Sequence, residues 1–423
     1  MQEGNPANLY FRCESVPQKP LLMSETKTGK RRIGVVTTSR ADYSHLYWPL
    51  RELAAHPDVE LGVFALGAHL SPEFGSTIKE IEGDGFPGIE IKARIECLLS
   101  SDSDTGMAKT IGLAMLGLAD ALTAWRPDLL LLIADRYEML APASVALALR
   151  IPVAHIEGGE ISQGAIDDQV RNALTKLAHI HFTSTETARR RVIAMGEEPW
   201  RVTLAGAPSL DHLSRSGLLD RPALEVRLGL ALGLPSILAA YHPVTILRDT
   251  TAEADALFAA LAQAPGQLLF VYPNADAGSY ALIERTRALA ATRGRTRIFV
   301  NLDAVTYWSL LGQVDAMVGN SSSGIMEAAS FALPTVNVGM RQQGRERARN
   351  IIDAPAETVA ILAAIETALS PEFRKNLRGM VNPYGDGTAA TTIARVLTTV
   401  PLDGLLIKQP TPLTTEVEPP HAL

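Results

Sequence analysis

Short apolar runs alternate with longer segments of helical periodicity from about residue 31 onward. Runs of strand length occupy residues 33–37, 60–66, 128–133 and 153–156, and helical patterns occupy 43–55, 106–125 and 142–149. Few polar residues interrupt the runs, which is typical of parallel strands covered on both faces. The pattern predicts a doubly wound, Rossmann-type α/β domain over residues 31–207.

The same alternation then starts again. Five further runs predict strands at residues 236–240, 268–272, 297–301, 316–318 and 335–338. Residues 207–235 contain Pro208 and Pro222 and no strand pattern, so we place the domain junction near 205–210 and the second domain at 208–387. Two such domains facing each other leave a central cleft at the carboxyl ends of their strands, where ligands bind in this class.

The ends of the chain differ from its middle. A helical pattern covers residues 388–400, and the tail 401–423 contains five prolines and is expected to be irregular. Residues 1–30 are polar and mixed, and we expect a flexible N-terminal extension. Residues 1–22 lack the apolar core of a signal peptide.

Composition narrows the function classes. The chain has 423 residues, 47% of them hydrophobic and 20% charged, which excludes a disordered protein. Its formal net charge of -7, without a long basic block, disfavours nucleic acid and anionic membranes as partners. No apolar run is expected to reach the ~18–20 residues that cross a bilayer. The two cysteines, Cys13 and Cys97, exclude a disulfide framework and a Cys-rich zinc site, so we expect a cytoplasmic protein.

The strongest chemical signal is the motif GNSSSGIME at residues 319–327, between a strand and a helical pattern. Small residues let the backbone approach a ligand, and free N–H groups at a helix start favour an anion. The motif predicts a phosphate cradle at Ser321, Ser322, Ser323 and Gly324, with Glu327 one turn later placed to reach a ribose diol. The alternative is an ordinary N-cap in a serine-rich turn.

Basic residues follow two other strands. Arg341 and Arg345 come after the run at 335–338 and could face a diphosphate, or they could form a solvated basic turn. Arg40 lies in the loop after the first strand, facing the expected cleft. Asp42 lies in the same loop. It could equally cap the following helix or contact a ligand.

Acidic residues crowd the ends of two other strands. Asp135 directly follows the run 128–133, and the segment HIEGGE at 155–160 is followed by Asp167, Asp168 and Arg171. Crowded carboxylates raise one another's pKa and can act as paired acid and base. We expect Glu157 to transfer a proton, because it ends a buried strand, precedes two glycines and has acidic neighbours to raise its pKa. No Cys pair follows His155, and neither opening strand carries a GxGxxG or Walker A pattern, so metal and nicotinamide chemistry are disfavoured.

In order along the chain, these motifs resemble the hydrolysing UDP-N-acetylglucosamine 2-epimerases, which release N-acetylmannosamine and UDP in sialic-acid pathways. The similarity covers residues of about 31–395 and rests on SRADY at 39–43, GAHLSPEFG at 67–75, DRYE at 135–138, HIEGGE at 155–160, AIDD at 165–168, the serine motif at 319–324 and the Arg341/Arg345 turn. The resemblance implies a GT-B-like fold with a C-terminal helix that crosses back. It also implies elimination of UDP to a 2-acetamidoglucal, followed by addition of water.

The resemblance assigns roles to residues of this chain. The carboxylates Asp135, Glu157 and Asp168 would handle protons, His242 would be the pocket histidine, and the serine motif would hold the diphosphate near Arg40 and Arg345. The expected substrate-binding residues are Arg40, Asp42, His155, Arg171, Asn274, Ser321, Ser322, Ser323, Gly324, Glu327, Arg341 and Arg345. A UDP-sugar is the expected small-molecule partner, no cofactor or metal is expected, and the chain is expected to form a homodimer or homotetramer.

The chain also departs from the family pattern. Asn172 stands where relatives commonly have His, and Thr38, Ser44 and Ala134 stand where Gly is common. These changes leave the exact sugar open, and UDP-2,4-diacetamido-2,4,6-trideoxyhexose is a second candidate substrate. Two other classes remain as alternatives: a GT-B glycosyltransferase, and a nucleotide-sugar binding protein without catalysis.

Overall fold

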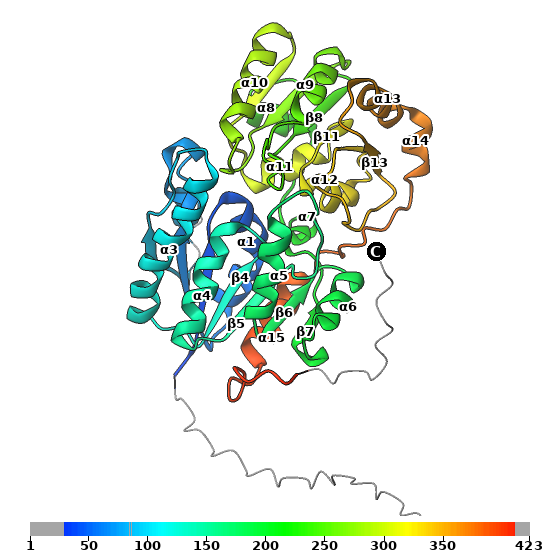
Figure 1. Ribbon diagram of the computed structural model, residues 1–423. Coiled ribbons are helices and arrows are strands. Elements are labelled where there is room, and N and C mark those ends of the chain that lie inside the picture. The colour runs from blue at the N-terminus through cyan, green and yellow to red at the C-terminus, as the bar shows by residue number, and fades with distance from the viewer. Residues whose placement is uncertain (1–28, 84, 86, 411–423) are drawn as a thin grey trace, which may run out of the picture.

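The computed structural model describes residues 29–83, 85 and 87–410. Its first half is a seven-stranded sheet in the order β3-β2-β1-β4-β5-β6-β7 (Figure 1). The strands are β1 (Arg31–Thr37), β2 (Val59–Leu66), β3 (Ile89–Ile95), β4 (Leu129–Ile133), β5 (Val153–Ile156), β6 (Ile180–Thr183) and β7 (Val202–Leu204). All neighbouring strands pair in parallel.

The second half repeats this plan with a six-stranded parallel sheet in the order β10-β9-β8-β11-β12-β13. Its strands are β8 (Ser236–Ala240), β9 (Gln267–Val271), β10 (Thr296–Phe299), β11 (Ala316–Gly319), β12 (Thr335–Val338) and β13 (Ile351–Ala354). Two Rossmann-type sheets are therefore confirmed. The domain boundaries drawn from the sequence stay a prediction.

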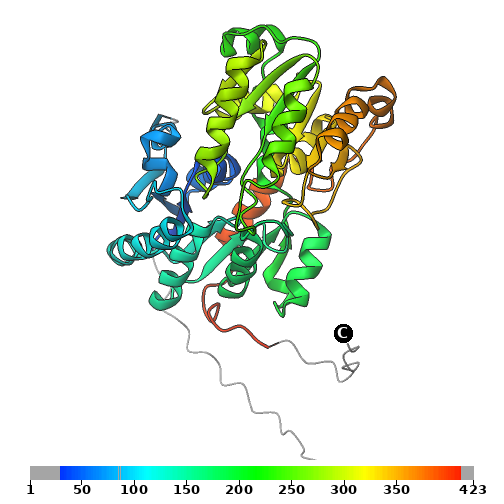
Figure 2. The ribbon, with the colours of Figure 1, turned by 45° about the horizontal axis from the view of Figure 1, so that its top comes forward.

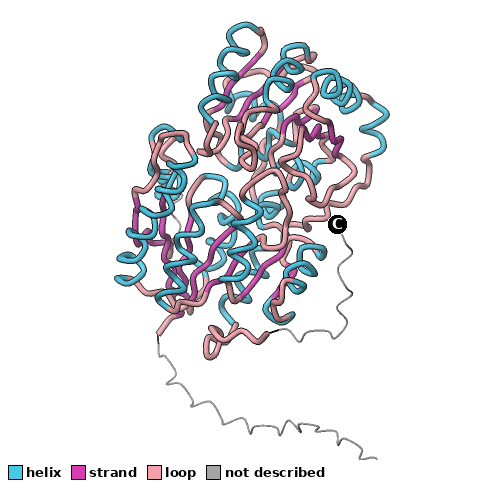
Figure 3. The backbone as a smooth tube through the Cα atoms, viewed as in Figure 1, coloured by secondary structure: helices cyan, strands magenta, loops and turns pink. Residues whose placement is uncertain are grey.

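Helices cover both faces of each sheet (Figure 3). They are α1 (Arg40–Ala55), α2 (Ile78–Gly83), α3 (Asp104–Ala124), α4 (Leu140–Leu149), α5 (Asp167–Leu177), α6 (Glu186–Ala194), α7 (Asp211–Arg215), α8 (Arg221–Leu228), α9 (Ala254–Gln263), α10 (Ser279–Thr292), α11 (Ala304–Leu311), α12 (Ser322–Met326), α13 (Thr358–Leu369), α14 (Pro371–Asn376) and α15 (Ala389–Thr399). Along β8, Ile237 and Ala239 belong to one buried cluster, and Leu238 and Ala240 belong to another. Because successive side chains of a strand point to opposite faces, both faces of this sheet are buried.

The last helix returns to the first domain. Ile393 and Leu397 of α15 are fully buried in the core that surrounds the first sheet, and the red α15 lies among the blue and green elements in Figures 1 and 2. The carboxylate of Asp211 accepts hydrogen bonds from Ala389 N and Ala390 N, both at 2.9 Å, which caps the start of α15. The expected crossing helix of a GT-B-like fold is confirmed.

The segment after α15 has no helix or strand over residues 401–410. It is nevertheless held to the first domain, because Arg201 donates to Leu405 O at 3.0 Å and to Ile407 O at 2.7 Å. The expectations for residues 1–28 and 411–423 lie outside the described residues.

One expectation about apolar length is wrong. Helix α3 has 21 residues, and the mean hydropathy of its most apolar window is 1.3, so by length and composition alone it could cross a bilayer. Its buried residues are Gly106, Thr110, Ala114, Leu118 and Leu122. They recur every four positions, so one face of α3 packs on the first domain while the other face is exposed.

Candidate active site

The carboxyl ends of the two sheets face each other across two adjoining pockets. The acidic pocket lies mainly between the loops after β4, β5 and β12, and its polar lining residues are Asp42, His45, Asp135, Arg136, Tyr137, Glu157, Ser162, Asp167, Asn274, Asp276, Ser322, Arg341, Gln342 and Arg345. The serine pocket lies on the side of the second domain, and its polar and aromatic lining residues are Arg40, Ser44, His45, Ser209, His242, Tyr272, Asn274, Tyr307, Trp308, Ser321, Ser322, Ser323, Glu327 and Arg341. His45, Asn274, Ser322 and Arg341 line both pockets, so the two are continuous.

Glu157 stands at the end of β5 in a strained backbone conformation. Its φ is 67°, in the left-handed region that non-glycine residues seldom occupy. Such strain costs of order 1–3 kcal/mol and gathers at functional sites. The turn places a buried carboxylate on the wall of the acidic pocket, where Oε1 lies 2.9 Å from His45 Nδ1.

The charge state of Glu157 differs from the one expected. Burial raises its pKa, but the charge and hydrogen bond of His45 and the charge of Arg345 outweigh burial, so the pKa lies below the usual value. The expected net rise of this pKa was therefore wrong: the charge of Asp135 does raise it, but by less than His45 and Arg345 lower it. The physical reason is a histidine supplied by α1, which local sequence around Glu157 does not show.

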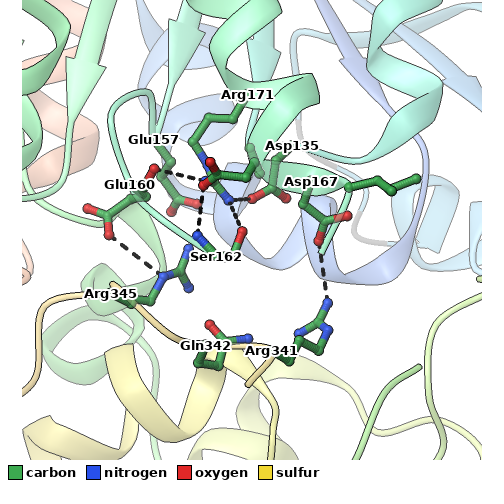
Figure 4. Close-up of polar contacts among 12 residues, drawn as sticks. Asp135, Glu157, Glu160, Ser162, Asp167, Arg171, Arg341, Gln342 and Arg345 are labelled. Atoms are coloured by element: carbon green, nitrogen blue, oxygen red, sulfur yellow. Dashed lines mark hydrogen bonds and ion pairs between the residues drawn. The ribbon is translucent and has the colours of Figure 1, made fainter. Parts of the chain in front are cut away.

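Asp135 is held by a buried arginine (Figure 4). Arg171, only 1% exposed, donates to Asp135 Oδ2, to Ser162 Oγ at 2.9 Å and to Glu160 O at 2.9 Å. Burial raises the pKa of Asp135, but the charges of Arg171, Arg345 and Arg341 lower it by more. The pKa therefore lies below its usual value. The preceding Ala134 has a φ of 57°, a conformation that suits the glycine of the family pattern.

The two aspartates at the start of α5 play different parts. Asp167 lines the acidic pocket, whereas Asp168 is not on its wall and instead accepts from Ser162 N at 2.8 Å and from Arg171 at 3.1 Å. Burial and the nearby Asp135 charge raise the pKa of Asp167 to about 7, against the opposing effect of Arg341. Asp167 thus retains a proton at a pH at which Asp135 and Glu157, whose pKa values are lowered, are ionised.

Two arginines from the second domain face these carboxylates (Figure 4). Arg345 Nε lies 3.7 Å from Glu160 Oε2, and Arg341 Nη2 lies 3.4 Å from Asp167 Oδ2. Arg345 is buried, and Glu160 and other acidic groups outweigh burial, so its pKa is raised and its charge is kept.

The serine motif forms the turn from β11 into α12. Ser321 accepts from Ser323 N at 3.3 Å, and Tyr307 lies 2.7 Å from Ser323 Oγ. Gly319 has a φ of 142°, and an added Cβ would lie 2.0 Å from Ala240 O, so the turn requires glycine there. Gly324 is not on the pocket wall, and a Cβ there would meet Thr335 at 2.7 Å, so this glycine serves the packing of α12 on β12.

His242 is a neutral imidazole in the serine pocket. Burial and the charges of Arg341, Arg136 and Arg40 lower its pKa well below the usual value. Asn274 N donates to His242 Nδ1 at 3.3 Å, which leaves the hydrogen on Nε2. Arg40 in the same pocket reaches across the cleft to Leu302 O at 3.2 Å and to Asn301.

Other expected residues take local roles. His155 is fully buried and its Nε2 lies 2.7 Å from Ala134 O, away from both pockets. Asp42 lines the acidic pocket, but its carboxylate also accepts from Thr38 N at 2.9 Å and from Thr38 Oγ1 at 2.5 Å. Ser39 is the N-cap of α1, so of the two alternatives left open for Asp42, that of an N-cap is wrong. Asn172 of α5 does not line either pocket.

His45 was missed by sequence reasoning. It lies three residues after Asp42 in α1 and lines both pockets. A histidine within a helix does not by itself indicate a functional site. Its position two residues after the SRADY motif could have identified it as a pocket residue. Within residues 29–83, 85 and 87–410, no group of three His, Cys, Asp or Glu side chains is arranged to hold a metal ion.

Comparisons with known proteins agree with this architecture. The family described as UDP-N-acetylglucosamine 2-epimerase matches residues 51–398. The GDP/UDP-N,N'-diacetylbacillosamine 2-epimerase (hydrolyzing) of Campylobacter jejuni is 37% identical over 350 residues, 82% of this chain and 90% of that protein. The UDP-N,N'-diacetylbacillosamine 2-epimerase (hydrolyzing) of Legionella pneumophila is 36% identical over 381 residues, 90% of this chain and 98% of that protein.

A solved structure shares the fold. The UDP-GlcNAc 2-epimerase from Neisseria meningitidis bound to UDP-GlcNAc superimposes with a TM-score of 0.71 at 16% identity, over 86% of this chain and 99% of that chain. The family match runs from the last turns of α1 into α15 and includes the pocket loops after β4, β5, β11 and β12. The chain therefore belongs to the UDP-N-acetylglucosamine 2-epimerase family.

Proposed function

We propose that this protein is a hydrolysing 2-epimerase that converts a UDP-2-acetamido sugar into the free 2-epimeric sugar and UDP. One observation carries the proposal: Glu157 and Asp167 line one pocket with opposite pKa shifts, the first lowered and the second raised to about 7. A base and an acid are thus available at the same pH. The adjoining serine pocket offers donors suited to a diphosphate.

In the first half-reaction, Glu157 takes the proton from sugar C2 while the bond between C1 and the UDP oxygen breaks. The electron pair of the C2–H bond becomes the C1–C2 double bond of a 2-acetamidoglucal. Charge develops on the β-phosphate of UDP as it leaves. We assign the stabilisation of that charge to pocket-lining donors: Ser321–Ser323, Arg341, Arg345 and the Nε2–H of His242.

In the second half-reaction, water adds across the double bond. Its oxygen bonds to C1 and loses one proton to the carboxylate that has just protonated C2. The C2 proton arrives on the opposite face, which inverts that centre, and the proton held by Glu157 leaves to solvent. The protonated Asp167 is our candidate donor for this step, in the place that the resemblance gave to Asp168. Asp135, ionised against Arg171, is placed to orient the sugar and the water.

For the sugar itself, we propose a UDP-2,4-diacetamido-2,4,6-trideoxyhexose, with UDP-GlcNAc as the second candidate. Support comes from the relatives of 36% and 37% identity, both named for UDP-N,N'-diacetylbacillosamine. A UDP-N-acetylglucosamine 2-epimerase of Neisseria meningitidis is 32% identical over 344 residues. Asn274 and Gln342 line the acidic pocket and could hydrogen-bond a second acetamido group.

The test is to incubate the pure protein with each UDP-sugar, without an acceptor, and to identify the products. Free UDP together with the 2-epimeric free sugar supports the proposal, and the ratio of kcat/KM for the two substrates decides between the sugars. UDP release only when an acceptor is added would indicate a glycosyltransferase. Binding without turnover would indicate a nucleotide-sugar binding protein.

We also propose that the protein acts in the cytoplasm as a homodimer or homotetramer. The proposed substrates are charged nucleotides of biosynthetic metabolism, which supports the compartment. Light scattering on the full chain tests the oligomer, and a monomeric mass would contradict it.

A further inference from the structure

His45 stands where the acidic pocket and the serine pocket meet. It projects from α1 of the first domain, and each of its ring nitrogens faces a different carboxylate. Nδ1 lies 2.9 Å from Oε1 of Glu157 at the end of β5, and Nε2 lies 3.5 Å from Oε1 of Glu327 after α12. The imidazole therefore connects the expected base to a carboxylate of the second domain.

Nδ1 makes a hydrogen bond to Glu157, and Nε2 lies at ion-pair distance from Glu327, so each ring nitrogen faces an acidic side chain. A histidine with both nitrogens protonated carries a positive charge. Burial lowers the pKa of His45, but the charges of Glu157 and Glu327 outweigh it and raise the pKa to about 9. His45 is thus a cation across the neutral pH range.

Both acidic and basic side chains surround the pair His45 and Glu157. Asp42 on the same helix favours the charged form of His45, and the charge of His45 helps to lower the pKa of His212 of α7. Glu157 also faces Asp135, which raises its pKa, and Arg345, which lowers it. Of these groups, His45 makes the direct hydrogen bond to the Glu157 carboxylate.

Glu327 is held from a second side. Ser209 donates to the same Oε1 atom at 2.7 Å, and Glu327 lines the serine pocket. A ligand that hydrogen-bonds to Glu327 Oε1 would therefore bind an atom that also contacts His45. The chain Ser209, Glu327, His45 and Glu157 runs continuously from the serine pocket into the acidic pocket.

We propose that His45 is a positioning residue that keeps Glu157 ionised and aimed into the acidic pocket, and that links this base to Glu327 in the serine pocket. The inference rests on the proposed function, since it gives His45 its role through the base of that reaction. In this role the charge of residue 45, rather than its shape, sets the ionisation of Glu157. A side chain that only fills space would not have this effect.

The test compares His45→Asn, which keeps a hydrogen-bond donor without the charge, with His45→Lys, which restores a cation. His56→Asn, at the C-cap at the other end of α1, is the matched control. For each protein, kcat/KM for UDP release is measured from pH 5 to pH 9, and circular dichroism at each pH reports the fold. UDP affinity is measured by calorimetry.

In His45→Asn, the pKa of Glu157 should rise, so the fall in kcat/KM on acidification should begin at higher pH. At a given pH the ionised-to-protonated ratio of Glu157 should drop about tenfold for a pKa rise of one unit, so the midpoint of the acidic limb of kcat/KM should move up by about one pH unit relative to the wild type. His45→Lys should reverse most of this shift, and His56→Asn should match the wild type. A folded His45→Asn protein with the wild-type pH profile would overturn the inference.

A second readout does not depend on turnover. Nuclear magnetic resonance of the imidazole in the full chain should show that His45 titrates near pH 9 in the wild type and at lower pH in Glu157→Gln. An unchanged His45 titration in Glu157→Gln would overturn the inference even if His45→Asn fails to fold. Failure of the proposed function looks different: the wild type would release no UDP from either sugar while the linked titration persisted.

Discussion

Asp167 Oδ2 and Arg341 Nη2 lie 3.4 Å apart, and this ion pair joins the first residue of α5 to the loop after β12 across the cleft. It ties the acid of the first domain to a cation of the second. Because the pKa of Asp167 is about 7, small changes around this pair alter its charge at physiological pH.

Replacing Asp167 with Asn should remove this titration. In the wild type, kcat/KM should fall as pH rises above about 7, since the acid is then ionised; in Asp167→Asn, kcat/KM should fall by about 10²–10⁴-fold and lose that alkaline limb. The pH profile of the formation of the free 2-epimeric sugar measures both effects, because Asp167 acts after UDP has left. An alkaline limb that persists in the variant would assign the acid to another group.

The same substitution has a consequence for stability. The pKa of Asp167 is raised in the folded state, so its contribution to stability is full below the unfolded pKa and is lost as pH rises through about 7. The melting temperature of Asp167→Asn relative to wild type should therefore increase between pH 5 and pH 8. Thermal melts at both pH values check this, and a constant difference would contradict the raised pKa.

Glu157→Gln keeps the shape of the side chain and removes the base. Turnover should fall by about 10³ or more while UDP affinity stays within a few-fold. In D₂O the wild type should place deuterium at C2 of the product. Glu366→Gln, on the exposed side of α13, is the control. Near-normal turnover in Glu157→Gln would refute its role, and product without deuterium would refute the elimination.

Ser322→Asp should abolish UDP binding. Ser322 lines both pockets at the start of α12, and a carboxylate there would repel a diphosphate while leaving the fold intact. Calorimetry with UDP measures the loss, and Ser214→Asp on the exposed face of α7 should bind normally. Near-normal UDP affinity in Ser322→Asp would show that the diphosphate binds elsewhere.

Gly164 tests the contact between the domains. A Cβ at this position would lie 2.5 Å from Arg341 Cα and 2.7 Å from Arg341 N, where backbone atoms cannot easily move aside. Gly164→Ala should lower kcat/KM about tenfold or more by holding Arg341 away from the acidic pocket. Gly112→Ala on α3, where a Cβ meets no atom within 4 Å, is the control. Wild-type kcat/KM in Gly164→Ala would show that this contact is dispensable.

Turnover should need neither a metal nor a nicotinamide. Activity should be unchanged after dialysis against EDTA and without added NAD, since carboxylates, arginines and a neutral histidine supply the proposed chemistry. Product formation before and after chelation measures this. Loss of activity that one added metal restores would contradict the prediction.

The local pattern of apolar residues was enough to predict much of the fold. Strand β4 is a continuous apolar run, and β1, β2, β5, β8 and β12 are mostly apolar and buried. Such runs are typical of strands covered on both faces. Strands β3, β6, β7 and β13 were missed. Three of them lie at sheet edges, where half-exposed residues such as those of Ile89–Ile95 blur the pattern, and β6 is only four residues long.

The sequence by itself also determined where the chemistry would gather, because the motifs follow strands whose carboxyl ends share one edge of each sheet. Only the tertiary structure decided which residues face the pockets. Asp167 and Asp168 are neighbours on α5, but successive helix positions point about 100° apart, and the packing of α5 turns Asp167 into the cleft. The charge states were likewise decided by distant segments, since His45 lowers the pKa of Glu157 across 112 residues of sequence. Such electrostatic effects depend on distances that only the folded chain creates.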